Sequence, residues 1–394
     1  EGARGFDLSE VPLLRALLVR LKADDHVLLL SLHHIVTDEW SGEILQRELA
    51  EAYGAYQAGR APAFDDLPVQ YADFATWQRE RLAGDALELE LGYWRQRMDA
   101  APLQLDLPLD HPRSSSLRIA PGASESLVFS RTITQAVREL GRRHGTTTFV
   151  TMLAALKVLL FRYTGQSDIV VGSPIANRAR TELDGLIGLF VNTLPLRTHV
   201  HGEDEFVRVL LSVRETALEA FDHQDLPFEK LVAELQPERR AGGTPFVNVL
   251  FVMRNKDGRR VELPGLSMTP YRLDAAPAKF DLTVHVSDDG GDLGCTIQYN
   301  AELFERASIR RMLAHFETLL ANIAVAPDRP IASLPLLSDD ERHEMLVRWN
   351  DTATDYGPDD TVHEAFAMQA HRTPNAVAVA DDQAQLTYRE LDER

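Results

Sequence analysis

The chain has 394 residues, 44% of them hydrophobic and 26% charged, an ordinary globular composition with enough apolar material for more than one core. Its 60 acidic against 41 basic residues give a net charge of -19, which argues against nucleic acid and anionic membrane surfaces as partners. A single cysteine, Cys295, excludes an internal disulfide framework, and its strand-like neighbours favour a buried thiol over a nucleophile. The low cysteine count indicates a reducing, cytoplasmic compartment, and the longest apolar runs are too short to cross a bilayer, so we expect no membrane anchor.

The first 60 residues predict a β-hairpin followed by a helix. Two apolar stretches, 12–22 and 26–34, are joined by a short polar turn. Ser41 is placed to cap a helix whose apolar residues recur at helical spacing and which ends before Gly59. Because the first residue is Glu1 and strands follow closely, we expect the chain to begin inside a domain.

The remaining elements interleave helices and strands without a regular repeat. Residues 60–70 and 100–125 are rich in proline, aspartate and serine and flank a helical stretch at 71–98, so we expect them to mark a crossing between two lobes. The spacing of apolar residues predicts helices near 133–144, 149–163, 205–221 and 307–322 and strands at 168–173, 247–253, 280–286 and 293–299.

Composition also predicts where the chain divides. We expect the remainder of an N-terminal lobe at 1–65 and a crossing segment with a C-terminal lobe at 66–335. A linker at 336–360 and the start of a further unit at 361–394 follow.

One segment concentrates groups that carry chemistry. The second predicted strand ends in the nonapeptide HHIVTDEWS, residues 33–41. Successive strand side chains point to opposite faces, so one histidine should brace the chain while the other faces a cavity. A histidine with a pKa near neutrality suits proton removal from an amine or alcohol during acyl transfer. On this segment alone acyl transfer, a structural histidine pair and a metal site stay open, although no His-rich or Cys-rich partner segment supports a metal.

Five segments in order resemble the motifs of condensation domains from nonribosomal peptide synthetases. HHIVTDEWS resembles the HHxxxDG signature of that family, and four later segments are similar to its further motifs: YADFATW at 71–77, IGLFVNTLPLR at 187–197, HQDLPFE at 223–229 and AKFDL at 278–282. The resemblance covers roughly residues 1–335. Two features depart from the family pattern: its two earliest motifs are absent, and Glu39 stands where the family has glycine.

The resemblance implies an α/β fold with two chloramphenicol-acetyltransferase-like lobes in a V and a central tunnel. Phosphopantetheine arms of an upstream (donor) and a downstream (acceptor) peptidyl carrier domain would enter that tunnel from opposite faces. The acceptor amine would attack the donor aminoacyl or peptidyl thioester to form a peptide bond. No covalently bound cofactor and no metal are implied.

The resemblance also implies roles for single residues. His34 would be the catalytic residue in the tunnel, and His33 would brace the strand end. Asp38 would point away from the substrate and pair with an arginine of the other lobe, for which Arg178 is the candidate; alternatively it only caps the helix near Ser41.

Two further residues of the nonapeptide, Glu39 and Trp40, are candidates for the acceptor side of the tunnel. One interpretation of Glu39 is that it is no more than a favourable negative charge at a helix N-terminus. The sharper hypothesis is that its bulk and charge favour a small acceptor amino acid.

Two other functions stay open at this point. An epimerization domain shares the fold and the paired histidines, but residues 362–394 resemble the opening of an adenylation domain, the unit that normally follows a condensation domain. A non-catalytic docking module of the same fold tends to lose the active histidine, whereas His34 is present. The expected partners are therefore two carrier domains and an adjacent adenylation domain, with no nucleic acid and no membrane.

Overall fold

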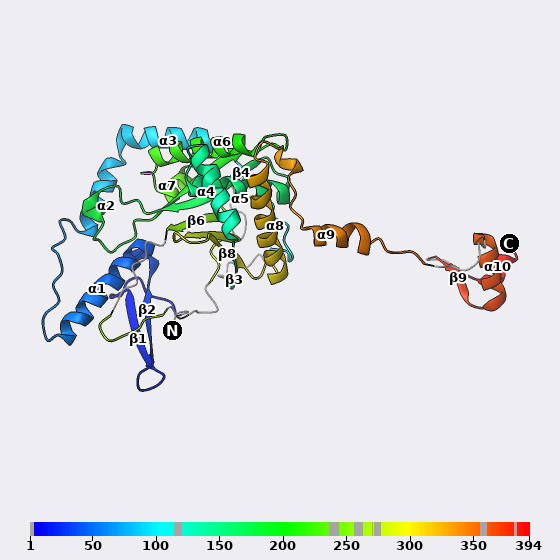
Figure 1. Cartoon of the computed structure of the whole chain (residues 1–394), viewed down its shortest axis with the longest axis horizontal. Coiled ribbons are helices and arrows are strands. Elements are labelled where there is room, and N and C mark those ends of the chain that lie inside the picture. Colours follow the sequence, from blue (N-terminus) through cyan, green and yellow to red (C-terminus); the bar gives the residue numbers. More distant parts are fainter. Residues whose placement is uncertain are drawn as a thin grey trace. The chain divides into compact units, whose positions relative to one another are not determined.

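The computed structural model describes residues 4–113, 120–235, 244–255, 263–269, 271, 277–354, 361–381 and 384–394 (Figure 1). The chain forms two compact units, Glu1–Ser338 and Asp339–Arg394. No single helix in these ranges is long and apolar enough to cross a membrane; the helices α4 (Arg131–Arg143) and α5 (Thr148–Thr164) pass that test only as a pair bent by 107°.

The first unit begins with the predicted hairpin. Strands β1 (Leu14–Arg20) and β2 (His26–Leu32) are antiparallel, with Leu14 opposite Leu32. The chain then leaves the strand at His33 and forms the short 3-10 turn η1 (His34–Val36).

Helix α1 (Glu39–Gln57) follows the turn and starts earlier than expected. The sequence offered Ser41 and, as an alternative, Asp38 as its cap; the N-cap is Asp38, whose side chain accepts a hydrogen bond from the backbone nitrogen of Ser41, and Ser41 as the cap was wrong. Both residue types are favourable caps. Asp38 prevails here because its carboxylate also receives hydrogen bonds from the Ser41 hydroxyl and from a distant loop.

The predicted helical stretch at 71–98 is two helices, α2 (Tyr71–Arg81) and α3 (Gly84–Met98). Gly84 has a positive φ of 54°, a conformation that glycine adopts at little cost. The chain therefore turns between the two helices.

The centre of the first unit is a six-stranded mixed sheet in the order β3-β8-β7-β6-β4-β5. Its three middle strands β7, β6 and β4 are parallel, and the flanking pairs are antiparallel. The strands are β3 (Gly122–Val128), β4 (Asp168–Ile175), β5 (Asn192–His199), β6 (Val249–Asn255), β7 (Leu282–Asp288) and β8 (Gly294–Asn300).

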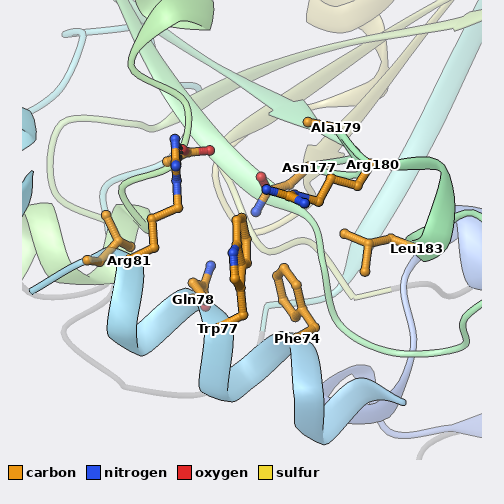
Figure 2. Close-up of a pocket in the computed structure, with 10 residues that line it drawn as sticks. Phe74, Trp77, Gln78, Arg81, Asn177, Ala179, Arg180 and Leu183 are labelled. Carbon is orange, nitrogen blue, oxygen red and sulfur yellow. Dashed lines mark hydrogen bonds and ion pairs between the residues drawn. The ribbon is translucent and has the colours of Figure 1, made fainter. Parts of the chain in front are cut away.

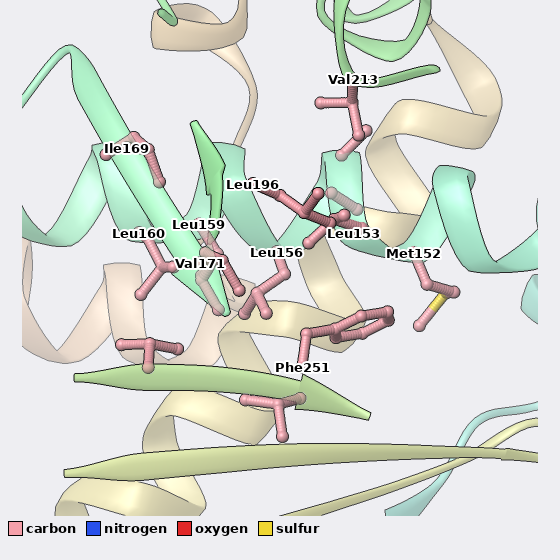
Figure 3. Close-up of a cluster of buried hydrophobic side chains, with 14 of the residues drawn as sticks. Met152, Leu153, Leu156, Leu159, Leu160, Ile169, Val171, Leu196, Val213 and Phe251 are labelled. Carbon is pink, nitrogen blue, oxygen red and sulfur yellow. The ribbon is translucent and has the colours of Figure 1, made fainter. Parts of the chain in front are cut away.

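The main core lies between this sheet and the helices packed on it. Helix α5 is buried on every side from Val150 to Leu160, as an apolar helix in the middle of a core must be (Figure 3). Its one charged member, Lys157, donates hydrogen bonds of 2.7 Å to the Leu196 carbonyl and to Thr198, and burial lowers its pKa well below the usual value. The other helices of this unit are α6 (Phe206–Asp222), α7 (Phe228–Leu235) and α8 (Arg306–Val325).

The second unit contains short elements only. They are α9 (Asp339–His343), the π-helical turn η4 (Glu344–Arg348), α10 (Val362–Arg372), β9 (Val377–Ala380), β10 (Gln385–Thr387) and α11 (Tyr388–Asp392). The first two lie inside the range 336–360 that the sequence predicted as a linker, and the end of that range, 355–360, lies outside the described residues.

Candidate active site

The two histidines at the end of β2 have different surroundings. The Nδ1 atom of His34 lies 2.6 Å from the carbonyl oxygen of Thr37. Because a carbonyl oxygen only accepts, Nδ1 must carry the hydrogen in this contact. The other ring nitrogen, Nε2, is then an unprotonated acceptor in neutral His34, and the side chain is exposed at the surface of the described chain.

His33 is tied into the fold instead. Its Nδ1 accepts a hydrogen bond of 3.1 Å from the backbone nitrogen of Ile35 and so caps the turn η1. Its ring packs edge-on against Phe6, and its backbone nitrogen donates to the Leu13 carbonyl. These contacts fix the point at which the chain leaves the hairpin.

Asp38 joins the start of α1 to the segment between β4 and β5, residues 176–191, which we call the β4–β5 loop. One carboxylate oxygen accepts from the backbone nitrogen and hydroxyl of Ser41 at 2.8 and 2.7 Å, and the other accepts from the backbone nitrogen of Phe190 at 3.0 Å. Arg178 completes the set at 3.5 Å. Burial raises the pKa of Asp38, but these hydrogen bonds and the arginine outweigh it and hold the pKa below its usual value.

Arg178 is the central residue of that loop, and its side chain is only 1% exposed. It donates to the carbonyls of Leu183 and Leu186 and to the hydroxyl of Ser41, and its guanidinium lies 3.9 Å from the centre of the Phe190 ring. Burial lowers the pKa of Arg178, and this effect outweighs the opposite influence of the nearby carboxylates of Asp38 and Asp184.

The two roles that the sequence offered for Asp38 therefore occur together. It caps α1 and it lies beside Arg178. The sequence did not single out Ser41 for this contact, although its hydroxyl donates to Asp38 and accepts from Arg178 and from the backbone nitrogen of Gly188 at 3.1 Å. We call Asp38, Ser41, Arg178 and the backbone of 188–190 the Asp38 junction.

Gly188 gives a test of this junction. A Cβ atom at this position would lie 2.2 Å from the ring of Tyr71, whose hydroxyl donates to the Leu189 carbonyl at 2.8 Å. We expect Gly188→Ala to lower the free energy of unfolding by about 1–3 kcal/mol, because the ring must move and loses its contacts. Urea unfolding followed by circular dichroism measures the change. Gly92→Ala is the control: no atom lies within 4 Å of its Cβ, and alanine in a helix stabilises by about 0.5–1 kcal/mol. Equal unfolding midpoints in Gly188→Ala and the parent protein would contradict the predicted clash.

Two further motif segments meet at Asn192. Its Nδ2 donates to the carbonyls of Gln224 and Leu226 at 2.9 and 2.8 Å, and its Oδ1 accepts from the backbone nitrogen of Phe228. The segments 187–197 and 223–229 are thus held side by side by one buried amide. Arg197, at the end of the first segment, forms a bidentate pair with Asp168 on the neighbouring strand.

Glu39 and Trp40 lie at the first turn of α1. The Glu39 side chain is 62% exposed and forms an ion pair of 2.7 Å with Arg254 on β6. The indole nitrogen of Trp40 donates to the carbonyl of Asp184 at 3.0 Å. Both residues therefore connect α1 to the rest of the first unit, and Arg254 is a partner that the sequence did not reveal.

His285 on β7 lies beside Arg254 and was also missed by the sequence analysis. Burial, with the charge of Arg254, lowers its pKa to about 4, and its Nδ1 has no hydrogen-bond partner within the described residues. The only sequence signal is a polar residue between the buried Val284 and Val286, which places it on the opposite face of the sheet.

Cys295 is 1% exposed and burial raises its pKa to about 12, which confirms the predicted buried thiol. In the part of the chain that the structure describes, no three His, Cys, Asp or Glu side chains are grouped closely enough to hold a metal ion.

A condensation-domain family model matches residues 1–346, and the chain belongs to that family. It is 45% identical over 394 residues to a linear gramicidin synthase protein of Brevibacillus parabrevis and 40% identical over 389 residues to malpinin synthetase of Mortierella alpina. These matches cover 100% and 99% of the chain but only 5% of each relative, so the chain spans a small part of the proteins it matches.

Solved structures agree with the family assignment. The X-domain from teicoplanin biosynthesis superposes with a TM-score of 0.77 at 28% identity, over 85% of this chain and 77% of that chain. A four-domain nonribosomal peptide synthetase superposes with a TM-score of 0.81 at 21% identity, over 98% of this chain and 30% of that chain. The fold is the predicted α/β, chloramphenicol-acetyltransferase-like fold of condensation domains. Condensation domains of synthetases are acyltransferases that form peptide bonds, and this chain is a member of that class.

Proposed function

We propose that this condensation domain joins a donor aminoacyl or peptidyl thioester to an acceptor aminoacyl thioester and that His34 is its catalytic residue. The observation that carries the proposal is the contact between His34 Nδ1 and the Thr37 carbonyl, which leaves Nε2 as the acceptor. The acceptor nitrogen attacks the thioester carbonyl, a C–N bond forms and the C–S bond breaks. Nε2 accepts the proton that the amine loses and passes it to the departing sulfur, so the donor arm is released as a thiol and His34 returns to its neutral form.

The expected acceleration of peptide-bond formation has two sources. Holding the two ends together supplies up to about 7–11 kcal/mol of barrier lowering, and a positioned base contributes about 10²–10⁴-fold in rate. His33, Asp38 and Arg178 act as positioning residues in this proposal, because their contacts fix the backbone on both sides of His34.

Both substrates would arrive on phosphopantetheine arms of an upstream and a downstream carrier domain, which enter a tunnel between the two lobes, 1–65 and 66–335. The arms belong to the partners, and the domain itself needs no bound cofactor. A cytoplasmic location is part of this proposal, and the one cysteine, a free and buried thiol, is in keeping with a reducing compartment.

The residues after the condensation domain would be the opening of an adenylation domain. The family match ends at residue 346, and a separate unit begins at Asp339. The synthetase relatives nevertheless match the whole chain, and the four-domain synthetase covers 98% of it where the X-domain covers 85%. These differences support an adjacent adenylation domain as the downstream neighbour.

A second candidate function is partner docking without catalysis. It is favoured by one relative, an X-domain whose structure is a complex with OxyB. The intact His34, whose Nδ1 contact leaves Nε2 as the acceptor, favours catalysis.

The deciding experiment is a single-turnover reaction of the full chain with two loaded carrier domains. Mass spectrometry of the acceptor carrier should show the condensed product. An inverted donor residue without condensation would identify an epimerization domain, and no reaction together with carrier binding would identify a docking module.

Glu39 leads to a prediction on acceptor choice. We propose that Glu39 and Trp40 border the acceptor side and that the Glu39 ion pair with Arg254 narrows it, so that small acceptors such as glycine are preferred. In Glu39→Gly the single-turnover rate for a bulky acceptor should rise about tenfold relative to the glycine rate, with stability changed by less than about 1 kcal/mol.

The matched variant is Arg254→Gln, which removes the ion pair and keeps the Glu39 side chain. If the ion pair narrows the acceptor side, Arg254→Gln should partly relax the preference for small acceptors. An unchanged ratio of rates in both variants would leave Glu39 as a charge at the N-terminus of α1 only.

A further inference from the structure

The ring of His285 on β7 carries a buried atom, Nδ1, that has no hydrogen-bond partner in the described part of the chain. Burial and the charge of Arg254 lower the pKa of His285 to about 4, so the ring is neutral near pH 7. A hydrogen bond with the Gln298 side chain acts in the opposite direction on this pKa, as a bond donated by the ring does. Because Nδ1 has no partner among these residues, that bond uses Nε2, and the neutral ring keeps a lone pair on Nδ1 that can accept a hydrogen bond.

Arg254 on the neighbouring strand β6 shares a face of the sheet with His285. In the parallel register Arg254 lies opposite Ser287, two residues beyond His285. Both side chains point away from the core, which the alternate residues Val284 and Val286 enter. The backbone positions of Arg254 and His285 are therefore one strand and two residues apart, about 8 Å. An extended arginine side chain spans most of that distance, so its guanidinium can reach the ring.

The guanidinium of Arg254 has a different partner in the structure. Its Nε lies 2.7 Å from a carboxylate oxygen of Glu39 at the start of α1, and the two side chains are 49% and 62% exposed. An ion pair this exposed is weak, because water and salt screen it. Water can also hydrogen-bond the Glu39 carboxylate, whereas a buried acceptor without a donor is costly. Arg254 thus lies between an acceptor that it holds weakly and one, Nδ1 of His285, for which the described residues provide no donor.

Another exposed ion pair of the first unit lacks this second acceptor. Arg81 on α2 pairs with Asp225 at 2.8 Å beside a pocket of about 340 Å³, into which Phe74 and Trp77 point (Figure 2). Among the described residues that line this pocket, none has a buried polar atom without a partner. An arginine released there has no such acceptor among the lining residues, whereas Arg254 has one on the next strand.

We propose that Arg254 has two positions: in one it pairs with Glu39, and in the other it donates a hydrogen bond to Nδ1 of His285. The second position is taken when another cation engages the Glu39 carboxylate, and the ammonium group of an incoming amine is such a cation. The inference rests on the proposed function, in which Glu39 borders the acceptor side. Arg254 narrows that side while it is paired with Glu39 and clears it when it moves to His285.

The second position requires a neutral ring. A protonated His285 would carry a hydrogen on Nδ1, and its charge would repel the guanidinium, so only the pair with Glu39 would remain. The residue at position 285 therefore decides whether Arg254 can leave Glu39 for the sheet. Leucine there would remove the second position, whereas glutamine would keep an oxygen that can accept a hydrogen bond.

Nitrogen NMR of the full chain with 15N-labelled histidine tests the two positions at pH 7. In the parent protein Nδ1 of His285 should resonate as an unprotonated nitrogen, and His285→Gln identifies its signal by its loss. Glu39→Gln releases Arg254, so the Nδ1 signal should move to lower frequency, the direction that accepting a hydrogen bond causes. The signal should stay in place in the double variant Glu39→Gln, Arg254→Ala, which has no guanidinium to donate.

Asp225→Asn is the matched control, because it breaks the similar ion pair of Arg81 elsewhere in the first unit. It should leave the His285 signal unmoved. An unmoved signal in Glu39→Gln, a protonated Nδ1 in the parent protein, or an equal shift in Asp225→Asn would overturn the proposal.

Acceptor selection tests the consequence of the second position. In His285→Leu, Arg254 stays on Glu39, so the single-turnover rate for a bulky acceptor relative to glycine should fall by up to about tenfold, the effect of one hydrogen bond. His285→Gln should keep most of the parent ratio. An unchanged ratio in His285→Leu would refute the role of Arg254 movement in acceptor choice. If the parent protein forms no peptide, the proposed function fails, and the NMR signal of His285 still decides whether Arg254 has two positions.

Discussion

His34→Ala is expected to lower single-turnover peptide formation by about 10²–10⁴-fold, the contribution of a positioned base. The physical reason is the fixed ring: Nδ1 is tied to the Thr37 carbonyl, so only Nε2 can take a proton from the acceptor amine. The measurement is rapid-quench analysis of donor and acceptor carriers loaded with one amino acid each. Because the side chain is exposed, the free energy of unfolding should change by less than about 0.5 kcal/mol.

Two companion variants separate the possible roles. His34→Asn keeps an amide N–H that can reach the Thr37 carbonyl but has no second nitrogen, so it should be as slow as alanine if Nε2 is the reacting atom. His33→Ala should instead lower the melting temperature, because the cap of η1 and the contact with Phe6 are lost. Full turnover by His34→Ala would show that the residue neither removes the proton nor positions the amine.

Asp38→Ala is expected to lower the free energy of unfolding by about 3–5 kcal/mol. The change leaves Arg178, whose side chain is 1% exposed, without its acidic partner, and it also removes the cap of α1. Urea unfolding measures the loss. Peptide formation should fall as well, since the backbone after His34 is no longer held.

An exposed ion pair on the same helix is the matched control. Glu51 and Arg60 lie 2.9 Å apart with side chains 38% and 52% exposed, and Glu51→Ala should cost at most about 1 kcal/mol. In the double variant Asp38→Ala, Arg178→Met the loss should be smaller than in Asp38→Ala alone, because no buried charge remains. Equal losses for Asp38→Ala and Glu51→Ala would reject the junction.

The pH dependence of stability has a defined sign. The pKa of Asp38 is lower in the folded protein than in the unfolded chain. The contribution of Asp38 to the free energy of unfolding is therefore fully present above the pKa of about 3.9 that an aspartate has in the unfolded chain. It is lost as the pH falls through the lower pKa of Asp38 in the folded protein.

The sequence predicted those elements whose signal lies in a short window. The hairpin and α5 were found because apolar runs and turn residues identify them directly. Two strands of the main sheet were missed, and both are edge strands. β3 is rich in glycine, alanine and serine, and β5 contains Pro195, which a strand tolerates only where one side needs no partner.

In the candidate site, too, the sequence revealed the local features and missed most of the contacts between distant segments. The nonapeptide at 33–41 is local, so its importance could be read from the motif. The partners of its side chains are distant in the chain, 140 positions for Asp38 with Arg178 and 147 for Ser41 with Gly188, and no spacing rule predicts which serine meets which glycine. Arg178 was found only through the family resemblance. Arg254 and His285 carried no motif.

The position of the Asp38 junction has a mechanical consequence. It fastens α1 to the loop before β5 at the very start of the helix, while the hairpin and the far end of α1 extend away from it. Glu39 and Trp40 attach the same end of α1 to Arg254 and Asp184, so we expect a swing of the hairpin against the six-stranded sheet to pivot near this end of the helix. His34 lies only four residues before Asp38, whereas the hairpin turn at 21–25 is more than ten residues away. If His34 is the catalytic residue, as proposed, a swing of the hairpin would leave the reacting nitrogen close to its place.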